Sequence, residues 1–480
     1  MNKKLDILNR GGFILDIKKK GQVFTPDYIV AEMLDKIRFC QDNVLHKVIL
    51  EPSFGDGQFL VAIITRIIQE GQKNNLSNSK ILEIIKKNVI GFEIDEVFYD
   101  ITIKKIKEVL LDNAIVYNGE FPNLHNGDTI ELYRLYENKV DFVIGNPPYV
   151  NTHNLKNREV IKSFSFSKKG MSDLYITFFE IGLKMLKSDG RLCFITPNSY
   201  FNSVAGKIMR KYIIENKLLT YIKNFGHYQV FDNITTYCCI TILDKQNKKN
   251  EIIYAKKDMS KNCLTYSDFY VNNLFCFDKT VDFEEIMNYN GEKYCFVKNG
   301  CATLLDSFFI DSELSKTSKF TVPIVKASTN KKYTCFYPYD KSGKLIPFDI
   351  IKKKDPITAK YLLRNKELLI KRAIDKPEYW HAFGRTQAIA DTYKRKYIIN
   401  TIYKDVLDIR VDICEKGCAV YSGLYILTDT DIETIKRILI SKDYLEYVKS
   451  FGRYKNGGYY TITSKEIEKY LNYKINEGKK

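Results

Sequence analysis

The sequence lacks several features that would point to particular classes of protein. Its 11 cysteines form no Cys-x-x-Cys pair and no histidine-rich segment accompanies them, which argues against a zinc site. Their odd number and scattered positions fit a reducing cytosol. Charged residues interrupt every apolar run and the first residues form no signal-peptide core, so we expect neither a membrane span nor a secretion signal.

What the sequence has in excess is positive charge. The 480 residues include 75 Lys and Arg against 58 Asp and Glu, which gives a net charge of +17. This charge favours a polyanionic partner such as nucleic acid, although chains encoded by AT-rich genomes are also rich in lysine. The length allows two or three domains, and a hydrophobic content of 45% is typical of globular proteins.

The first half of the chain alternates strand-like and helix-like patterns. Strands are expected at residues 48–50, 89–92, 142–144, 192–195, 221–224 and 238–243, and helices near 58–70, 97–110, 173–187 and 204–216. This alternation predicts an α/β fold with a doubly wound, mostly parallel sheet, whose ligands bind at the carboxyl ends of the strands. A polar stretch at 245–250 ends the alternation and predicts domains at 15–248 and 249–480.

The most informative motif is Asn146-Pro147-Pro148-Tyr149, which directly follows a predicted buried strand. The side-chain oxygen of Asn146 and the carbonyl of Pro147 can accept both hydrogens of one planar amino group. Tyr149 offers a flat face to a planar ring, and the prolines keep the loop open and stiff. The motif predicts a site that holds a ring-conjugated amine while its nitrogen attacks an electrophile. The alternative is a loop with turn chemistry only.

Other polar residues follow the predicted strands. The loop Glu-Pro-Ser-Phe-Gly-Asp-Gly at 51–57 contains no basic residue, so phosphate is not the expected ligand, and a plain structural turn is the alternative. Glu93 ends the second strand, where it could accept both hydroxyls of a ribose. Asp128 lies in a turn and could accept from an adenine amine. Thr25 precedes Pro26 and a helix, as a site residue or as a helix cap.

Taken in order, these segments resemble the class I S-adenosylmethionine-dependent methyltransferases, and with Asn-Pro-Pro-Tyr the gamma class of amino-DNA methyltransferases that modify adenine. The resemblance covers nearly the whole chain from about residue 18. It implies a seven-stranded Rossmann-like methyltransferase sheet and then a mixed α+β target-recognition domain. By position it implies a set of residues around S-adenosylmethionine, with Glu51 near its ammonium and Ile94 against its adenine: Thr25, Glu51, Ser53, Gly55, Gly57, Glu93, Ile94, Asp128 and Pro148.

The same resemblance places Asn146, Pro147, Tyr149 and Phe231 around the substrate base. Adenine's amine is buried in a duplex, so the base must be flipped into a pocket, where Tyr149 and Phe231 would stack on it. The expected rate gain comes from positioning and desolvation, without a cysteine nucleophile or a metal. The alternative for Phe231 is a core residue at the start of a strand.

The second half resembles the target-recognition domain of these enzymes. Several of its loops combine cations, amides, aromatics and glycine, a mixture that suits contacts to phosphates and base edges. The residues predicted to lie near DNA are Lys326, Arg385, Gln387, Arg453 and Lys455. The alternative for each loop is a solvated turn.

The resemblance implies sequence-specific methyl transfer from S-adenosylmethionine to the N6 amine of a flipped adenine in double-stranded DNA. Such an enzyme would belong to a restriction-modification system, with a separately encoded endonuclease as a candidate partner, or act alone near the nucleoid in a prokaryotic cytoplasm. About 20 residues precede the first motif, too few for a nuclease domain, so no cleavage is expected. The alternatives are an N-methyltransferase for ribosomal RNA or protein glutamine, and a catalytically silent DNA-binding subunit.

Overall fold

The computed structural model divides the chain into two compact units, Met1–Phe277 (unit 1) and Asp278–Lys480 (unit 2), which are described separately here. The structure describes residues 25–479 except 42, 153–154, 156, 169, 171, 232–235, 259 and 375–376. Residues 15–24 of the first predicted domain therefore lie outside the described part.

Unit 1 is built on one large sheet with the strand order β3-β2-β1-β4-β5-β7-β6-β8-β9. Strands β1 to β5 pair in parallel, whereas β7 runs antiparallel to both β5 and β6. The sheet is thus mostly parallel, as predicted, and every expected strand is present. The strands are β1 (Ile49–Glu51), β2 (Val89–Glu93), β3 (Leu124–Asn126), β4 (Val140–Gly145), β5 (Leu186–Pro197), β6 (Leu219–Asn224), β7 (Cys238–Asp244), β8 (Glu251–Lys256) and β9 (Lys261–Thr265).

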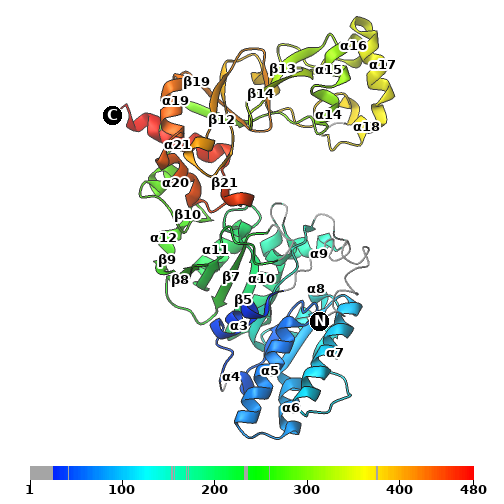
Figure 1. Ribbon diagram of the computed structural model, residues 1–480, viewed down its shortest axis with the longest axis vertical. Helices are drawn as coiled ribbons and strands as arrows, with labels where there is room; N and C mark the ends of the chain where they lie inside the picture. Colours follow the sequence, from blue (N-terminus) through cyan, green and yellow to red (C-terminus); the bar gives the residue numbers. More distant parts are fainter. Residues whose placement is uncertain are drawn as a thin grey trace. The chain divides into compact units, whose positions relative to one another are not determined.

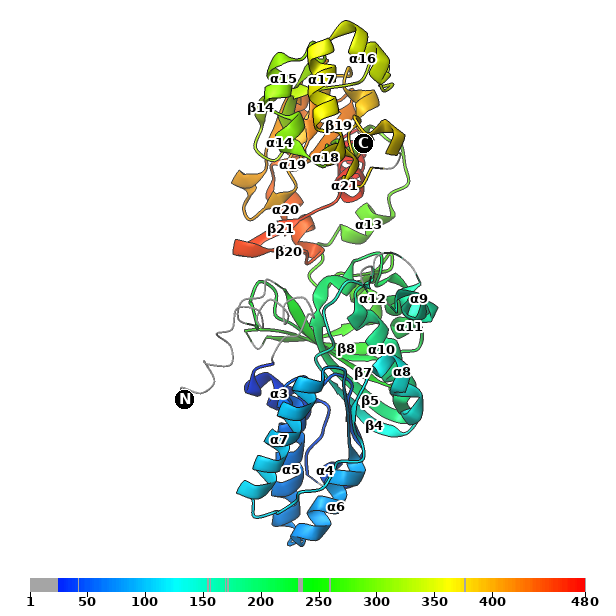
Figure 2. The same ribbon diagram turned by 90° about the vertical axis from the view of Figure 1, so that its right-hand side faces the viewer.

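Helices cover both faces of this sheet (Figures 1 and 2), which explains why β4 is buried along its whole length. One apolar cluster joins the sheet to α3 (Asp27–Lys36), α4 (Asn43–His46), α5 (Gln58–Lys73), α6 (Asn78–Asn88) and α7 (Glu96–Asp112). The other joins it to α8 (Thr129–Leu132), α9 (Arg158–Ser163), α10 (Leu174–Met185), α11 (Lys207–Glu215) and α12 (Tyr266–Phe269). The four helices predicted from the sequence correspond to α5, α7, α10 and α11.

Two features of unit 1 differ from the sequence-based expectation. The sheet has nine strands in the described residues rather than seven, and the unit ends at Phe277 rather than at residue 248. The polar stretch 245–250 is a loop inside the unit, because β8 returns to pair in parallel with β6 and β9 pairs with β8. A hairpin of β10 (Tyr270–Val271) and β11 (Leu274–Phe275) then buries Phe275 in the same core.

In its described residues, unit 2 mixes short helices with three small sheets, of orders β12-β19-β15-β17, β14-β13-β18 and β16-β21-β20. Its strands are β12 (Cys295–Asn299), β13 (Thr321–Lys326), β14 (Lys331–Phe336), β15 (Lys396–Ile399), β16 (Ile402–Tyr403), β17 (Val411–Cys414), β18 (Ala419–Tyr421), β19 (Leu424–Thr428), β20 (Tyr454–Lys455) and β21 (Tyr459–Thr461). Its helices are α13 (Phe283–Asn288), α14 (Asp306–Phe309), α15 (Glu313–Thr317), α16 (Phe348–Lys354), α17 (Pro356–Arg364), α18 (Lys366–Ile370), α19 (Ile432–Leu439), α20 (Lys442–Ser450) and α21 (Ser464–Glu477).

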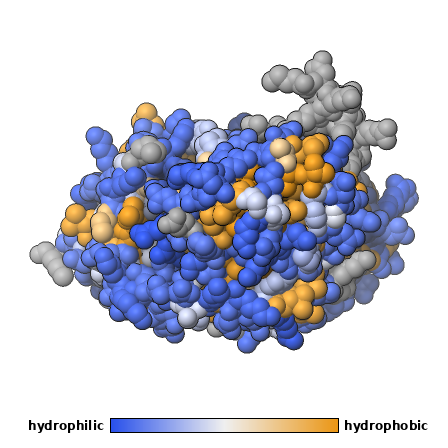
Figure 3. All heavy atoms as spheres, turned by 90° about the horizontal axis from the view of Figure 1, so that it is seen from below, coloured by the Kyte–Doolittle hydropathy of each residue, from blue (hydrophilic) through white to orange (hydrophobic). Residues whose placement is uncertain are grey.

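On the face drawn in Figure 3, polar residues predominate and apolar side chains form separate patches between them. Within the described ranges, no helix has both the length and the apolar character that crossing a bilayer requires.

Candidate functional site

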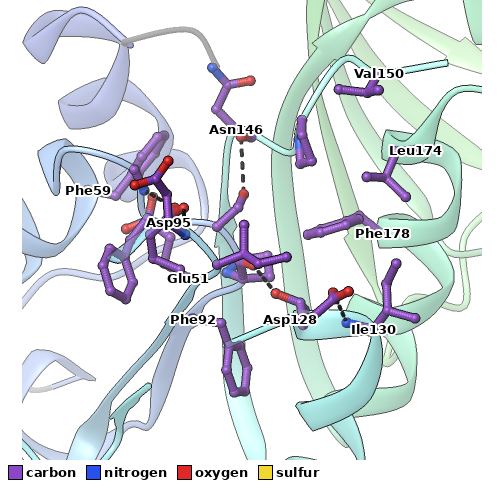
Figure 4. Close-up of a pocket in the computed structure, with 18 of the residues that line it drawn as sticks. Glu51, Phe59, Phe92, Asp95, Asp128, Ile130, Asn146, Val150, Leu174 and Phe178 are labelled. Carbon is purple, nitrogen blue, oxygen red and sulfur yellow. Dashed lines mark hydrogen bonds between the residues drawn. The ribbon is translucent and has the colours of Figure 1, made fainter. Parts of the chain in front are cut away.

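A cavity of about 800 Å³ lies in unit 1 at the carboxyl ends of β1, β2 and β4 (Figure 4). This is the edge of a doubly wound sheet at which ligands bind. Most of the predicted cofactor and catalytic residues line it: Thr25, Glu51, Ser53, Gly55, Glu93, Ile94, Asp128, Asn146 and Pro148. The topology of the sheet thus brings together residues that are far apart in the sequence.

The polar lining of the cavity is acidic. No Lys, Arg or His is among the described residues that line it. The acidic lining residues are Glu51, Asp56, Glu93, Asp95, Glu96, Asp128 and Glu131. A cationic ligand suits such a wall, whereas a phosphate group would be repelled by it. This agrees with the absence of basic residues from the loop at 51–57.

Glu51 is the most deeply buried of these acids, with 2% of its surface exposed. Burial raises the pKa of Glu51 well above its ordinary value, and the nearby carboxylates of Asp56 and Glu93 raise it further. Its Oε2 atom is buried and accepts no hydrogen bond from the residues that the structure describes. A buried carboxylate oxygen without a donor is costly, so the site fits a ligand that brings a cation or an N–H group to this atom.

Two side chains of α7 form hydrogen bonds to the loop between β1 and α5. The Thr102 hydroxyl donates to the Gly55 carbonyl at 2.8 Å, and Lys105 Nζ donates to the carbonyl oxygen and to Oδ2 of Asp56 at 2.6 and 2.9 Å. Gly57 does not line the cavity, contrary to its predicted cofactor contact. Gly57 is the N-cap of α5 and has a φ of +85°, a conformation that favours glycine. A Cβ atom at this position would lie only 2.6 Å from Thr102 Cγ2, so the residue is needed for the shape of the loop.

Glu93 faces the cavity and also organises its rim. Its Oε2 accepts from the Gly55 backbone N–H at 2.8 Å and its Oε1 accepts from that of Asp95 at 2.9 Å. Each oxygen keeps a second lone pair, so the carboxylate can still accept from ligand hydroxyls. Ile94, directly beside it, is 67% exposed, which leaves an apolar side chain free to contact a planar ring.

Asp128 is held by two donors. Its Oδ1 accepts from the Ile130 backbone N–H at 2.9 Å, which caps α8, and its Oδ2 accepts from Asn157 Nδ2 at 3.1 Å. Asn157 lines the cavity as well and was not predicted, because no strand end or motif marks its position. The far wall of the cavity is apolar and comes in part from α10, whose Leu174 and Phe178 are one helical turn apart.

Asn146 follows the last residue of β4 and is held at both its side chain and its backbone. Its Nδ2 donates to Thr25 Oγ1 at 3.1 Å, and its backbone carbonyl accepts from Ser53 Oγ at 3.3 Å. The alternative role of Thr25 as a helix cap is not observed, since Pro26 is the N-cap of α3 and no side chain caps that helix. The hydroxyl of Thr25 is bonded to Asn146 instead, and Thr25 lines the cavity.

Pro147, Tyr149 and Phe231 lie beside the cavity rather than in its lining. Pro147 is buried, and the Tyr149 hydroxyl donates to the Ile195 carbonyl at 3.2 Å. The rings of Tyr149 and Phe231 are close, with centroids 6.4 Å apart and planes tilted by 60°. Phe231 is only 3% exposed and belongs to an apolar core cluster. In this structure it is therefore a core residue, which was the alternative to a base contact.

The residues predicted to lie near DNA are spread over unit 2 and differ in their exposure and in their bonds to other residues. Arg385 and Lys455 are exposed, and Lys326 ends β13. Gln387 Nε2 donates to the Gly300 carbonyl at 2.9 Å. Arg453 forms a bidentate ion pair with Glu466, at 2.5 and 2.7 Å, and Glu466 Oε2 also accepts from the Thr463 backbone N–H at the start of α21. Arg453 thus anchors α21, which leaves its predicted DNA contact without support.

The fold and the cavity define a doubly wound α/β protein with an acidic cavity at the carboxyl ends of its parallel strands. Residues 53–231 match the model of the Eco57I restriction-modification methylase family. The predicted resemblance to the methyltransferases of restriction-modification systems is thereby confirmed over this part of the chain.

Two curated relatives illustrate the similarity. The chain is 28% identical over 411 residues to the Type II restriction enzyme and methyltransferase RM.Eco57I of Escherichia coli, covering 71% of this chain and 41% of that protein. It is 28% identical over 273 residues to the Type II methyltransferase M.BstVI of Geobacillus stearothermophilus, covering 53% of this chain and 47% of that one. The chain spans less than half the length of both relatives.

Two solved structures share the fold over nearly the whole chain. The Type IIL restriction-modification enzyme MmeI in complex with DNA matches with a TM-score of 0.61 at 13% identity, over 95% of this chain and 66% of that one. A nuclease-deletion mutant of the Type ISP restriction-modification enzyme LlaGI, with a DNA substrate mimic, matches with a TM-score of 0.59 at 15% identity, over 95% and 47%. At such identities the likeness describes the fold alone.

Proposed function

We propose that this chain transfers a methyl group from S-adenosylmethionine to the N6 amine of a flipped adenine at a specific sequence in double-stranded DNA. The observation that carries the proposal is the position of Asn146-Pro147-Pro148-Tyr149 at the carboxyl end of β4, beside an acidic cavity. The motif suits a ring-conjugated amine, and the cavity suits a cationic cofactor.

The cavity residues fit S-adenosylmethionine group by group. Glu51 Oε2, which is buried and accepts no hydrogen bond within the described part of the chain, would accept from the methionine ammonium. Glu93 would accept from the ribose hydroxyls, and Ile94 and Asp128 would contact the adenine ring and its amine. When bound, the cofactor supplies an electrophilic methyl group on a positively charged sulfur, and the acidic wall favours that charge.

The target amine would be handled by atoms of the motif. Asn146 Oδ1 and the Pro147 carbonyl oxygen would accept its two hydrogens, which directs the nitrogen lone pair out of the ring plane. Tyr149 is held by its bond to Ile195, so its ring is a fixed face for the base. Phe231, whose ring lies 6.4 Å from that of Tyr149, would have to become accessible for it to form the second face. Positioning of this kind raises the rate without a strong base.

DNA is proposed as the substrate for three reasons. The net charge of +17 favours a polyanion. The relatives are Type II methyltransferases of restriction-modification systems, and the whole-chain structural neighbours include complexes with DNA. Unit 2 offers the exposed cations Arg385 and Lys455 for phosphate contacts. A separately encoded endonuclease would complete a restriction-modification pair.

The test is methyl transfer from radiolabelled S-adenosylmethionine to duplex DNA of mixed sequence, ribosomal RNA and a glutamine-containing protein, each offered separately. The proposal expects label in duplex DNA alone, released as N6-methyladenine after digestion. Label in RNA or protein would select one of the other amine substrates. Binding of DNA without transfer, by a chain that binds no cofactor, would indicate a catalytically silent subunit.

A further inference from the structure

The Asn146-Pro147-Pro148 segment has a stiff backbone but few hydrogen-bond donors of its own. Neither proline has a backbone N–H, so two successive positions after Asn146 donate no hydrogen bond. The acceptor atoms that the proposed reaction uses, Asn146 Oδ1 and the Pro147 carbonyl oxygen, sit on this segment. The proline rings restrict the backbone but not the side-chain amide of Asn146, so hydrogen bonds from other parts of the chain can set the direction of that amide.

Two side chains provide that support from different directions. The Thr25 hydroxyl accepts from Asn146 Nδ2 at 3.1 Å, and the Ser53 hydroxyl donates to the Asn146 carbonyl at 3.3 Å. The amide nitrogen and oxygen of Asn146 diverge from the same planar carbon (Figure 4), so a bond that holds Nδ2 on the Thr25 side also turns Oδ1 to the other side of the amide. One bond fixes the amide plane and the other fixes the backbone that precedes Pro147.

We infer that Thr25 and Ser53 are positioning residues for Asn146, which holds the target amine, rather than polar ligands of the cofactor. The inference rests on the proposed function for its chemical meaning. Both residues line the cavity, and that position by itself would suggest contacts to a ligand. Their bonds to Asn146 indicate a different role.

The segment that carries Thr25 is itself anchored to the body of unit 1. Thr25 is 4% exposed and precedes α3. From α3, Glu32 accepts both bonds of a bidentate pair from Lys223 Nζ on β6, at 2.8 and 2.7 Å, and Lys223 is only 7% exposed. Asp35 pairs with Arg66 of α5 at 2.7 Å. A hydroxyl on so constrained a helix start can hold the Asn146 amide in one orientation.

The test uses the full chain and the variants Thr25→Val, Thr25→Ser and Ser53→Ala. Valine keeps the shape of threonine without its hydroxyl, and serine keeps the hydroxyl. In chain labelled with 15N-asparagine, the Asn146 side-chain amide is identified by its loss in Asn146→Asp. Its protons should exchange with water about 10-fold faster in Thr25→Val and within about twofold of the wild-type rate in Thr25→Ser.

Kinetics give the second measurement. Thr25→Val should lower kcat about 10- to 100-fold while the cofactor Kd, measured by calorimetry, changes less than about threefold, and Thr25→Ser should recover most of kcat. Ser53→Ala should show the same pattern with a smaller loss. If Thr25→Val instead weakens cofactor binding and keeps kcat at saturation, Thr25 is a cofactor ligand and the inference is wrong.

Unchanged amide exchange in Thr25→Val would also overturn the inference, whatever the activity. A wild-type chain that methylates no DNA would contradict the proposed function, whereas faster exchange in Thr25→Val would still support the bond that holds Asn146. The two claims therefore fail on different measurements.

Discussion

The two units differ in how their predicted residues come together. In unit 1, residues from separate segments meet at one cavity, because parallel strands end at the same edge of the sheet. In unit 2, the candidates lie on separate segments, some at strand ends and some in loops, and two of them, Gln387 and Arg453, already have partners within the chain. A binding site whose residues are brought together by sheet topology is therefore easier to predict from a sequence than DNA contacts that come from separate surface segments.

The largest effect is expected at the centre of the unit 1 cavity. Asn146→Ala removes an acceptor for the target amine, so kcat should fall by about 100-fold or more, a loss similar to that of removing one preorganised hydrogen-bonding group. Cofactor affinity should be nearly unchanged, because Glu51, Glu93 and Asp128 remain. Single-turnover methylation and calorimetry measure the two quantities, and near-full turnover would show that Asn146 does not hold the amine.

The next effect concerns stability in unit 2. Arg453→Ala leaves Glu466, which is 6% exposed, without its partner, and should cost about 3 kcal/mol of unfolding free energy. Arg385→Ala is the matched control, since Arg385 is exposed, and should cost less than about 0.5 kcal/mol. Urea unfolding measures both. Equal stability of the two variants would return Arg453 to the set of candidate DNA contacts.

A smaller effect, with opposite signs for binding and folding, is expected from Glu51→Gln. Loss of the carboxylate should weaken S-adenosylmethionine binding about 10-fold, since a charge-assisted hydrogen bond to the ammonium is lost. It should also stabilise the cofactor-free chain near neutral pH, because burial makes the ionised form of Glu51 costly.

The pH dependence of the same residue follows from the direction of its shift. The pKa of Glu51 is raised in the folded chain, so its contribution to stability is fully present below the ordinary carboxyl pKa and is lost as the pH rises through the folded pKa. Cofactor affinity should change the other way and weaken as the pH falls below the folded pKa. An affinity that stays the same as the pH rises from the ordinary carboxyl pKa would remove Glu51 from the ammonium site.

The sequence predicted the parts of the molecule that local patterns determine. The core strands show as apolar runs such as Val140–Gly145, and the site residues follow them at strand ends. Neither β3 nor β8 was predicted: β3 has only three residues, and β8 follows the polar stretch at 245–250 that predicted a domain boundary. Asn157 and the bonds of Thr25 and Ser53 to Asn146 depend on contacts between distant segments, which no local pattern encodes.

The smallest predicted effects test whether the free cations of unit 2 contact DNA. Lys455→Ala and Lys326→Ala should each weaken binding to all duplex sequences alike, by a fewfold, and lower the slope of log affinity against log salt by about 1. Arg385→Ala would do the same if it contacts phosphate, and would relax the sequence preference if it reads a base. Affinities unchanged in all three variants would direct the search to other loops.

The most direct test of the central claim is single-molecule sequencing of DNA from a methylation-free host that expresses this chain. The account predicts modified adenine within one sequence motif, and no modification when the host expresses Asn146→Ala. Unmodified DNA from cells that contain folded, cofactor-binding wild-type chain would contradict the claim that this chain by itself methylates adenine in DNA.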